Sequence, residues 1–92
     1  MNRPVDLSLE QRREIRRPAD GDVRLSTDAP SPVEIEGRLI DVSCGGFRVA
    51  HDCYDLGLGQ TVRFQHTAGS GVARVIWNRI LDRRVETGFL IL

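Results

Sequence analysis

Two short segments carry the side chains that are best suited to bind a nucleotide. Residues 12–17 read Arg-Arg-Glu-Ile-Arg-Arg and gather four guanidinium groups within six residues. Residues 41–46 read Asp-Val-Ser-Cys-Gly-Gly and place a carboxylate and a hydroxyl two residues apart, ahead of two glycines. Arginine binds phosphate through a bidentate fork and stacks on bases, and glycine lets a ligand come close to the backbone. Together the segments suit a ligand that carries both guanine and phosphate.

The length and charge of the chain limit what these segments can belong to. A chain of 92 residues forms one domain. It buries only about 60–65% of its unfolded surface, so a deep catalytic cleft between two lobes is not expected. The formal net charge is zero, which argues against affinity for long nucleic acid through bulk charge. All thirteen basic residues are arginine; a coding bias accounts for most of them but not for the cluster at 12–17.

The cysteines and the apolar segments bear on the compartment. No stretch resembles a secretory signal or a membrane span, so we expect a cytoplasmic protein without membrane insertion, whose thiols stay reduced. A zinc site would have to draw on Cys44, His51, Cys53 and His66, but the short paired spacing of zinc ligands is missing. The sequence therefore predicts no bound metal and no cofactor.

The first 22 residues are expected to form an N-terminal arm. Ser8 begins a capping box that favours a short helix. Pro18 disfavours helical geometry at Arg17, so such a helix ends there. The arm is therefore expected to be flexible or short-helical. The sequence leaves open whether residues 12–17 form a last helical turn or an extended segment.

After the arm, the alternation of apolar residues indicates β-strands. The apolar side chains fall first on odd numbers and then on even numbers, at Ile40 and Val42. This switch predicts a β-bulge around Gly37. It also turns Asp41 and Ser43 to the face opposite the core.

Turn signals divide residues 23–92 into six short strands. Gly45 and Gly46 form a tight turn that makes residues 38–50 a hairpin. Six short strands without a second helical pattern indicate an all-β fold, a small six-stranded antiparallel split β-barrel. The later strands are expected at residues 61–64, 72–77 and 85–92, with turns at residues 68–71 and 80–83.

With both motifs ahead of this strand pattern, the chain resembles the PilZ domain family, whose members are bacterial receptors for the second messenger cyclic-di-GMP. The family carries an Arg-x-x-x-Arg motif in an N-terminal arm and an Asp/Asn-x-Ser-x-x-Gly motif at a strand end. Residues 13–17 and 41–46 match these two motifs. The resemblance covers the chain from Glu10 onward and implies a PilZ-like barrel over residues 23–92. Many members carry a helix after the last strand, and no function of that helix is carried over.

The resemblance implies a role for each residue of the two motifs. Arginine forks reach phosphate oxygens or guanine O6 and N7, and a bidentate base contact adds about 1–3 kcal/mol of discrimination. Asp41 accepts from guanine N1–H and N2–H, Ser43 donates to a ring nitrogen or a carbonyl, and Gly46 leaves space for the purine. Trp77 is either a packing residue or a stacking platform. The implied ligand-binding residues are Arg12, Arg13, Arg16, Arg17, Asp41, Ser43, Gly45, Gly46 and Trp77.

The spacing of the arginines leaves the register of the first motif open, because Arg12/Arg16 and Arg13/Arg17 both satisfy it. Arg13/Arg17 is preferred because it centres Ile15, where many similar proteins have an apolar residue. Arg12 then precedes the motif. In similar proteins such an extra arginine goes with binding of a stacked ligand dimer.

The sequence thus predicts a non-enzymatic cyclic-di-GMP receptor that acts on an effector protein, with motility or biofilm regulation as its field. Ordering six arm residues costs on the order of 10 kcal/mol. One charged hydrogen bond is worth roughly 1.5–3 kcal/mol, so several arginines must act together on the dianionic ligand. The arm is expected to be mobile alone and to become ordered when ligand binds, and this change is the expected signal.

Other functions remain open. The alternative is a PilZ-like protein-interaction module that does not bind nucleotide. A single-stranded nucleic-acid barrel needs several exposed aromatic residues in a positive groove, and only five aromatic residues are present. No Ser–His–Asp, metal or paired-carboxylate arrangement points to an enzyme. Four further polar residues are expected simply at the surface: Arg48, Arg74, His51 and His66.

Overall fold

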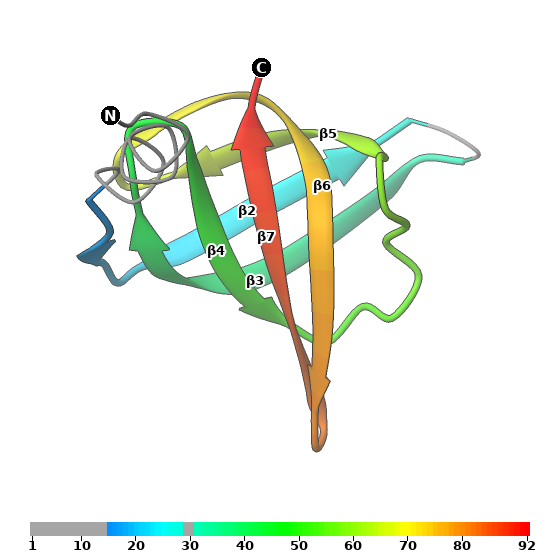
Figure 1. Cartoon of the computed structure of the whole chain (residues 1–92). Coiled ribbons are helices and arrows are strands. Elements are labelled where there is room, and N and C mark those ends of the chain that lie inside the picture. Colours follow the sequence, from blue (N-terminus) through cyan, green and yellow to red (C-terminus); the bar gives the residue numbers. More distant parts are fainter. Residues whose placement is uncertain (1–14, 29–30) are drawn as a thin grey trace, which may run out of the picture.

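The computed structural model describes residues 15–28 and 31–92. They form a closed six-stranded antiparallel β-barrel with one extra short strand, and none of them is helical (Figure 1). The predicted all-β barrel is therefore confirmed. The short helix expected from Ser8 lies outside the described residues. The described part of the chain holds no helix long and apolar enough to cross a membrane.

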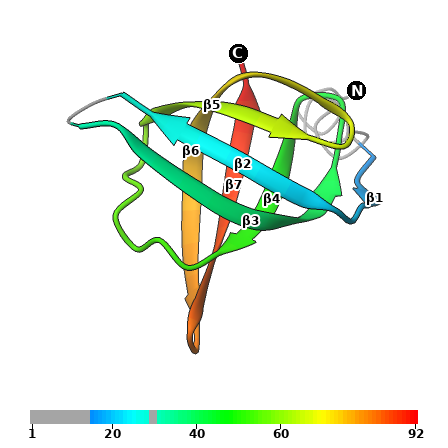
Figure 2. The ribbon, with the colours of Figure 1, turned by 180° about the vertical axis from the view of Figure 1, so that it is seen from behind.

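Seven strands run through the described residues: β1 (Arg17–Pro18), β2 (Asp22–Thr27), β3 (Val33–Val42), β4 (Gly46–His51), β5 (Thr61–His66), β6 (Gly69–Leu81) and β7 (Arg84–Ile91). Around the sheet their order is β1-β3-β2-β5-β6-β7-β4, and pairing between β3 and β4 closes the ring. The short strand β1 lies outside the ring and pairs with the last residues of β3 (Figure 2). The predicted hairpin over residues 38–50 is confirmed by the β3–β4 pair.

The barrel interior is filled by side chains that alternate along the strands. In β2, Val23 and Leu25 are buried and their neighbours face outward, as the two-residue period of a strand requires. Phe47 stacks on Phe89 with ring centroids 4.9 Å apart and lies 4.6 Å from Phe64. Burying each such side chain contributes roughly 1.5–3 kcal/mol. This core fixes β3, β4 and β7, the strands whose outer face carries the polar groups described below.

A β-bulge in β3 decides which way Asp41 points. Leu39 and Val42 both face the core although they are three residues apart. The register of the β3–β4 pair shifts between Leu39 and Asp41, so Ile40 is the extra residue. A bulge of one residue reverses the parity of the strand. Asp41 therefore faces outward, as the switch in the sequence predicted.

The predicted position of the bulge, around Gly37, is wrong. Gly37 pairs regularly with Val23. A Cβ on Gly37 would stand 2.6 Å from the carbonyl oxygen of Ala50 and 2.7 Å from a methyl of Val49. This glycine thus marks a close approach of β4, which is another reason for glycine in a strand.

Strand β6 is longer than predicted and has a bulge of its own. The sequence indicated residues 72–77, whereas β6 runs from Gly69 through Leu81, so the turns expected at residues 68–71 and 80–83 are both shorter. Asp82 makes this turn with a positive φ of 59°, which aspartate tolerates better than most residues. The β6–β7 register shifts between Val75 and Trp77. Val75 consequently lies in the core and Trp77 on the outer face.

Candidate functional site

A row of four residues crosses the outer face of the barrel from β3 to β6. Asp41 pairs with Arg48, Arg48 with Gly88, and Gly88 with Trp77. Residues directly opposite one another on neighbouring strands share one face of the sheet. The neighbours of Arg48 along β4 point into the core, so the row faces outward. We call these four residues the Asp41 row.

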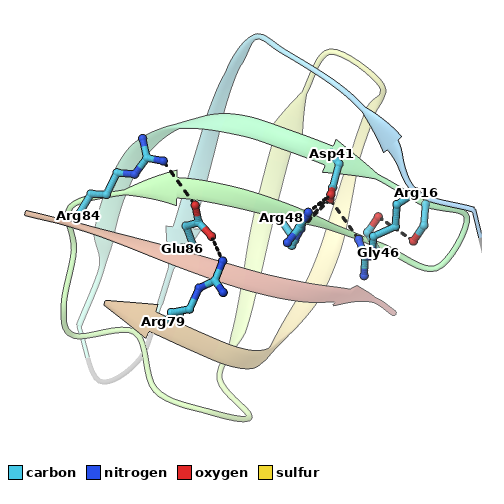
Figure 3. A network of polar contacts seen from close by, with 8 residues as sticks. Arg16, Asp41, Gly46, Arg48, Arg79, Arg84 and Glu86 are labelled. Carbon is cyan, nitrogen blue, oxygen red and sulfur yellow. Dashed lines mark hydrogen bonds and ion pairs between the residues drawn. The ribbon is translucent and has the colours of Figure 1, made fainter. Parts of the chain in front are cut away.

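Asp41 is almost fully covered by arginine side chains. Its exposed fraction is 5%. Arg48 Nε donates to both carboxylate oxygens, at 3.0 Å and 2.9 Å, and Arg48 Nη2 also donates to Oδ2 (Figure 3). These hydrogen bonds to Asp41 raise the pKa of Arg48 further above its ordinary value. Arg48 was expected to be simply solvated, and this expectation is wrong because the hairpin register sets it against Asp41.

The N-terminal arm and the hairpin meet at the same carboxylate. Arg16 Nη1 donates to Asp41 Oδ1 at 3.1 Å. The contact forms because β1 lies against β3, with Pro18 opposite Asp41 and the backbone N–H of Ala19 bonded to the carbonyl of Ile40 at 3.0 Å. Proline fits here because an edge strand can spare one N–H donor. Two segments that lie 25 residues apart in sequence therefore share one site.

The structure gives only part of the predicted arginine motif. Arg12 and Arg13 lie outside the described residues. Arg17 belongs to β1 and is exposed, so the extended alternative holds at Arg17 and Pro18. Of the arginines in the motif that the structure describes, Arg16 contacts the predicted acid.

The glycine turn packs against β7. The backbone N–H of Ser43 donates to the carbonyl of Gly46 at 2.9 Å, and the Ser43 hydroxyl lies 3.4 Å from the same oxygen. The carbonyl of Gly45 accepts from the N–H of Ile91 at 2.9 Å. A Cβ on Gly46 would come within 2.1 Å of the Phe89 carbonyl oxygen. The expectation that Gly46 leaves space for a purine is therefore wrong, because the backbone of β7 fills that space.

Trp77 packs against Gly88 on the neighbouring strand β7. A Cβ on Gly88 would come within 2.3–2.9 Å of three atoms of the indole, so the ring covers Gly88. Trp77 remains half-buried and is not part of the buried core. The indole thus closes the Asp41 row at the end opposite Asp41 and remains partly accessible.

A second group of charges, which the sequence reasoning missed, occupies the next outward row. Glu86 is buried to an exposed fraction of 7% and accepts from Arg79 at 2.7 Å and from Arg84 at 3.4 Å (Figure 3). The bond from Arg79 is the main reason why the pKa of Glu86 is lowered. Its position depends on the β6–β7 register, which is set by the short turn that pairs Leu81 with Arg84 and not by the longer turn expected at residues 80–83. The pairing of Arg48 with Asp41, in contrast, follows from the predicted hairpin once its loop length is fixed.

The two groups together leave the face positively charged. Four guanidinium groups surround two carboxylates, so the formal excess is two positive charges. All four arginine side chains keep 30% or more of their surface exposed. The guanidinium groups are therefore positioned by the acids but remain accessible to an anion.

A separate groove lies away from this face. The groove has a volume of about 680 Å³, runs over β2, β3 and β5 and is lined by charges of both signs, among them Arg24 and Glu36. It shares no residue with the Asp41 row. In the ranges that the structure describes, no three His, Cys, Asp or Glu side chains are grouped to hold a metal ion. His51, which was expected at the surface, is buried.

The chain matches no model of a known protein family, and no curated protein matches it.

Proposed function

We propose that this protein is a non-enzymatic PilZ-type receptor for cyclic-di-GMP, which signals to an effector protein. The observation that carries the proposal is the contact of Arg16 with Asp41 at 3.1 Å. It joins the arginine-rich arm to the acid of the hairpin motif, which are the two parts that such a ligand needs together. The fold of the described residues supports the same proposal, since the expected barrel places both parts on its outer face.

Charge supports a ligand with two phosphates. The face around Asp41 and Glu86 has a formal excess of two positive charges, and cyclic-di-GMP carries a net charge near minus two. Arginine forks bind phosphate oxygens in a bidentate manner. The exposed guanidinium groups of Arg16, Arg79 and Arg84 can serve as such forks.

The base would be held between Asp41 and Trp77. A carboxylate accepts from N1–H and N2–H of guanine, an arrangement that adenine does not present. The indole of Trp77 lies in the same row on the outer face, and stacking of a base on an aromatic ring contributes about 1–3 kcal/mol. Both contacts favour guanine bound flat along the Asp41 row.

The signal would be an ordering of the arm, limited to the residues before Arg17. Residues 17–21 are already held to β3 by strand pairing and by backbone hydrogen bonds of Ala19 and Gly21. The expectation that the whole arm moves is therefore wrong for this part. Hydrogen exchange with and without cyclic-di-GMP tests the rest: new protection must appear before Arg17, and unchanged protection there would rule out the switch.

One observation favours the alternative, a protein-interaction module that binds no nucleotide. Both oxygens of Asp41 already accept hydrogen bonds from the chain's own Arg16 and Arg48. Such a carboxylate is satisfied without a ligand. The two functions differ in whether cyclic-di-GMP can replace one of these arginines.

The chain provides its own probe for the test, because Trp77 is its single tryptophan and lies in the proposed site. Titration with cyclic-di-GMP should change the Trp77 emission in a saturable way. Cyclic-di-AMP and linear GMP should act only at much higher concentration, because the first lacks the guanine edge and the second has only one base. Equal responses to all three nucleotides, or no response to any of them, would contradict the proposal.

A further inference from the structure

We infer that Arg48 is a built-in competitor for guanine at Asp41, so that the receptor holds its own base site closed until the ligand displaces this side chain. The inference rests on the proposed function and concerns how the same site is regulated. It assigns to Arg48 a role that neither the arginine motif nor the hairpin motif contains.

The competition follows from the geometry of the donors. Arg48 presents Nε–H and Nη2–H side by side to the two oxygens of Asp41 (Figure 3). Guanine presents N1–H and N2–H side by side on the same kind of N–C–N unit. Both partners fill a carboxylate through two parallel hydrogen bonds. A guanidinium group and a guanine edge therefore present the same pair of donors to the carboxylate of Asp41.

Asp41 cannot accept hydrogen bonds from Arg48 and from guanine at the same time. Its exposed fraction is 5%, and Arg48 and Arg16 occupy the directions from which its oxygens accept. A carboxylate offers about four lone-pair sites, and three guanidinium nitrogens of Arg16 and Arg48 already make four hydrogen bonds to them. Guanine can bind in the plane of the carboxylate only after Arg48 has turned away.

Arg48 has room to leave. Its side chain is 30% exposed, compared with 7% for Asp41, so water can take over its hydrogen bonds. The Trp77 indole covers Gly88 on the β7 side, so the movement runs along the outer face toward Glu86 and not over Gly88. Glu86 lies in the next outward row and attracts the Arg48 charge. The displaced guanidinium thus moves from one acid toward another.

The substitution Arg48→Met tests the competition, because methionine is unbranched and has no donor. Loss of a positive charge beside a dianion by itself weakens binding. If Arg48 competes with guanine, however, its loss should tighten binding of cyclic-di-GMP by about tenfold, the worth of one charged hydrogen bond. Arg79→Met is the matched control, because Arg79 bonds to Glu86 on the same face at 2.7 Å. This control should bind no more tightly than the wild type.

A second measurement uses the wild-type protein and does not depend on the folding of a variant. The Nε–H resonance of Arg48, assigned by through-bond correlation to its own side-chain carbons in isotope-labelled wild-type protein, should be protected from solvent exchange and should lose this protection when cyclic-di-GMP saturates the site. Saturable ligand binding with an unchanged Arg48 resonance, or weaker binding by Arg48→Met, would overturn the competitor but leave the receptor intact. No binding by the wild type would overturn both.

Discussion

At the scale of single residues, Gly46 shows how closely the binding motif and the barrel depend on each other. The glycine belongs to the hairpin motif, yet its lack of a side chain is required by β7. A Cβ added at Gly46 cannot be accommodated by a small local shift, because the carbonyl that it would meet belongs to a paired strand. The motif glycine is thus a structural residue that also fixes the place of Asp41 and Ser43.

Gly46→Ala should therefore destabilise the protein strongly. The new Cβ would meet the Phe89 carbonyl oxygen at 2.1 Å, and overpacking of this kind costs about 3 kcal/mol. Urea unfolding of both proteins measures the loss. Gly57→Ala is the matched control, since a Cβ there meets no atom within 4 Å and its stability should stay near that of the wild type. Equal stability of the two variants would contradict the close approach of β4 to β7.

At the scale of elements, a series of hydrogen bonds that is buried at His51 and Thr87 connects β4, β7 and β6. His51 Nδ1 accepts from the N–H of Cys53 at 3.0 Å, so its Nε2 carries the proton and donates to Thr87 Oγ1 at 2.6 Å. Thr87 donates to Asn78 Oδ1 at 2.6 Å, and the Asn78 amide donates to the carbonyl of Leu56 at 2.9 Å. Each side chain in this series both accepts and donates a hydrogen bond, so the donors all point from His51 toward Leu56.

Removal of the central hydroxyl should cost stability without a change of shape. Thr87→Val leaves the buried His51 Nε2–H unpaired, which costs about 1–3 kcal/mol. Thermal unfolding compares this variant with Thr61→Val, whose threonine is exposed at the start of β5. The exposed change should be close to neutral. A Thr87→Val protein as stable as the wild type would show that the chain of hydrogen bonds contributes nothing.

The sequence predicts some elements of this site correctly and others wrongly. The alternation of apolar residues was enough for the barrel, the hairpin and the outward direction of Asp41. The bulge was placed wrongly, because Gly37 reflects the close approach of β4, the hairpin partner of β3. Glu86 and its arginines were missed because the turn was expected over residues 80–83, whereas Leu81 pairs with Arg84 and so sets Arg79 opposite Glu86. Local patterns predict faces, whereas the register of a strand pair depends on the exact turn length and on bulges.

At the scale of the whole molecule, burial of histidine makes stability depend on pH. Burial lowers the pKa of His51 and of His66 below the ordinary value of 6.5. The unfolded chain therefore binds more protons than the folded one as soon as the pH falls below about 6.5. Stability is complete above this pH and is lost as the pH falls toward the folded pKa values. The slope cannot exceed about 1.4 kcal/mol per pH unit for each histidine.

Urea unfolding between pH 7.5 and pH 5 measures this effect. Glu86 remains ionised in that window because its pKa is lowered from 4.5, so the histidines dominate the change. His51→Gln should show a smaller dependence on pH than the wild type. Stability that rises from pH 7.5 to pH 5 would contradict the burial of both rings.

The claim on which the account rests is that the arginine arm and the hairpin acid form one site for cyclic-di-GMP. Calorimetric titration at pH 7.5 of the wild type, Arg16→Ala, Asp41→Ala and Arg63→Ala tests it directly. Arg63 is the control because it lies on β5, a strand outside the Asp41 row, and forms an ion pair with Asp28. We predict saturable binding of one or two ligands per chain, about tenfold weaker in each of the two site variants and unchanged in the control. No heat of binding in the wild type, or full affinity in Asp41→Ala, would contradict the account.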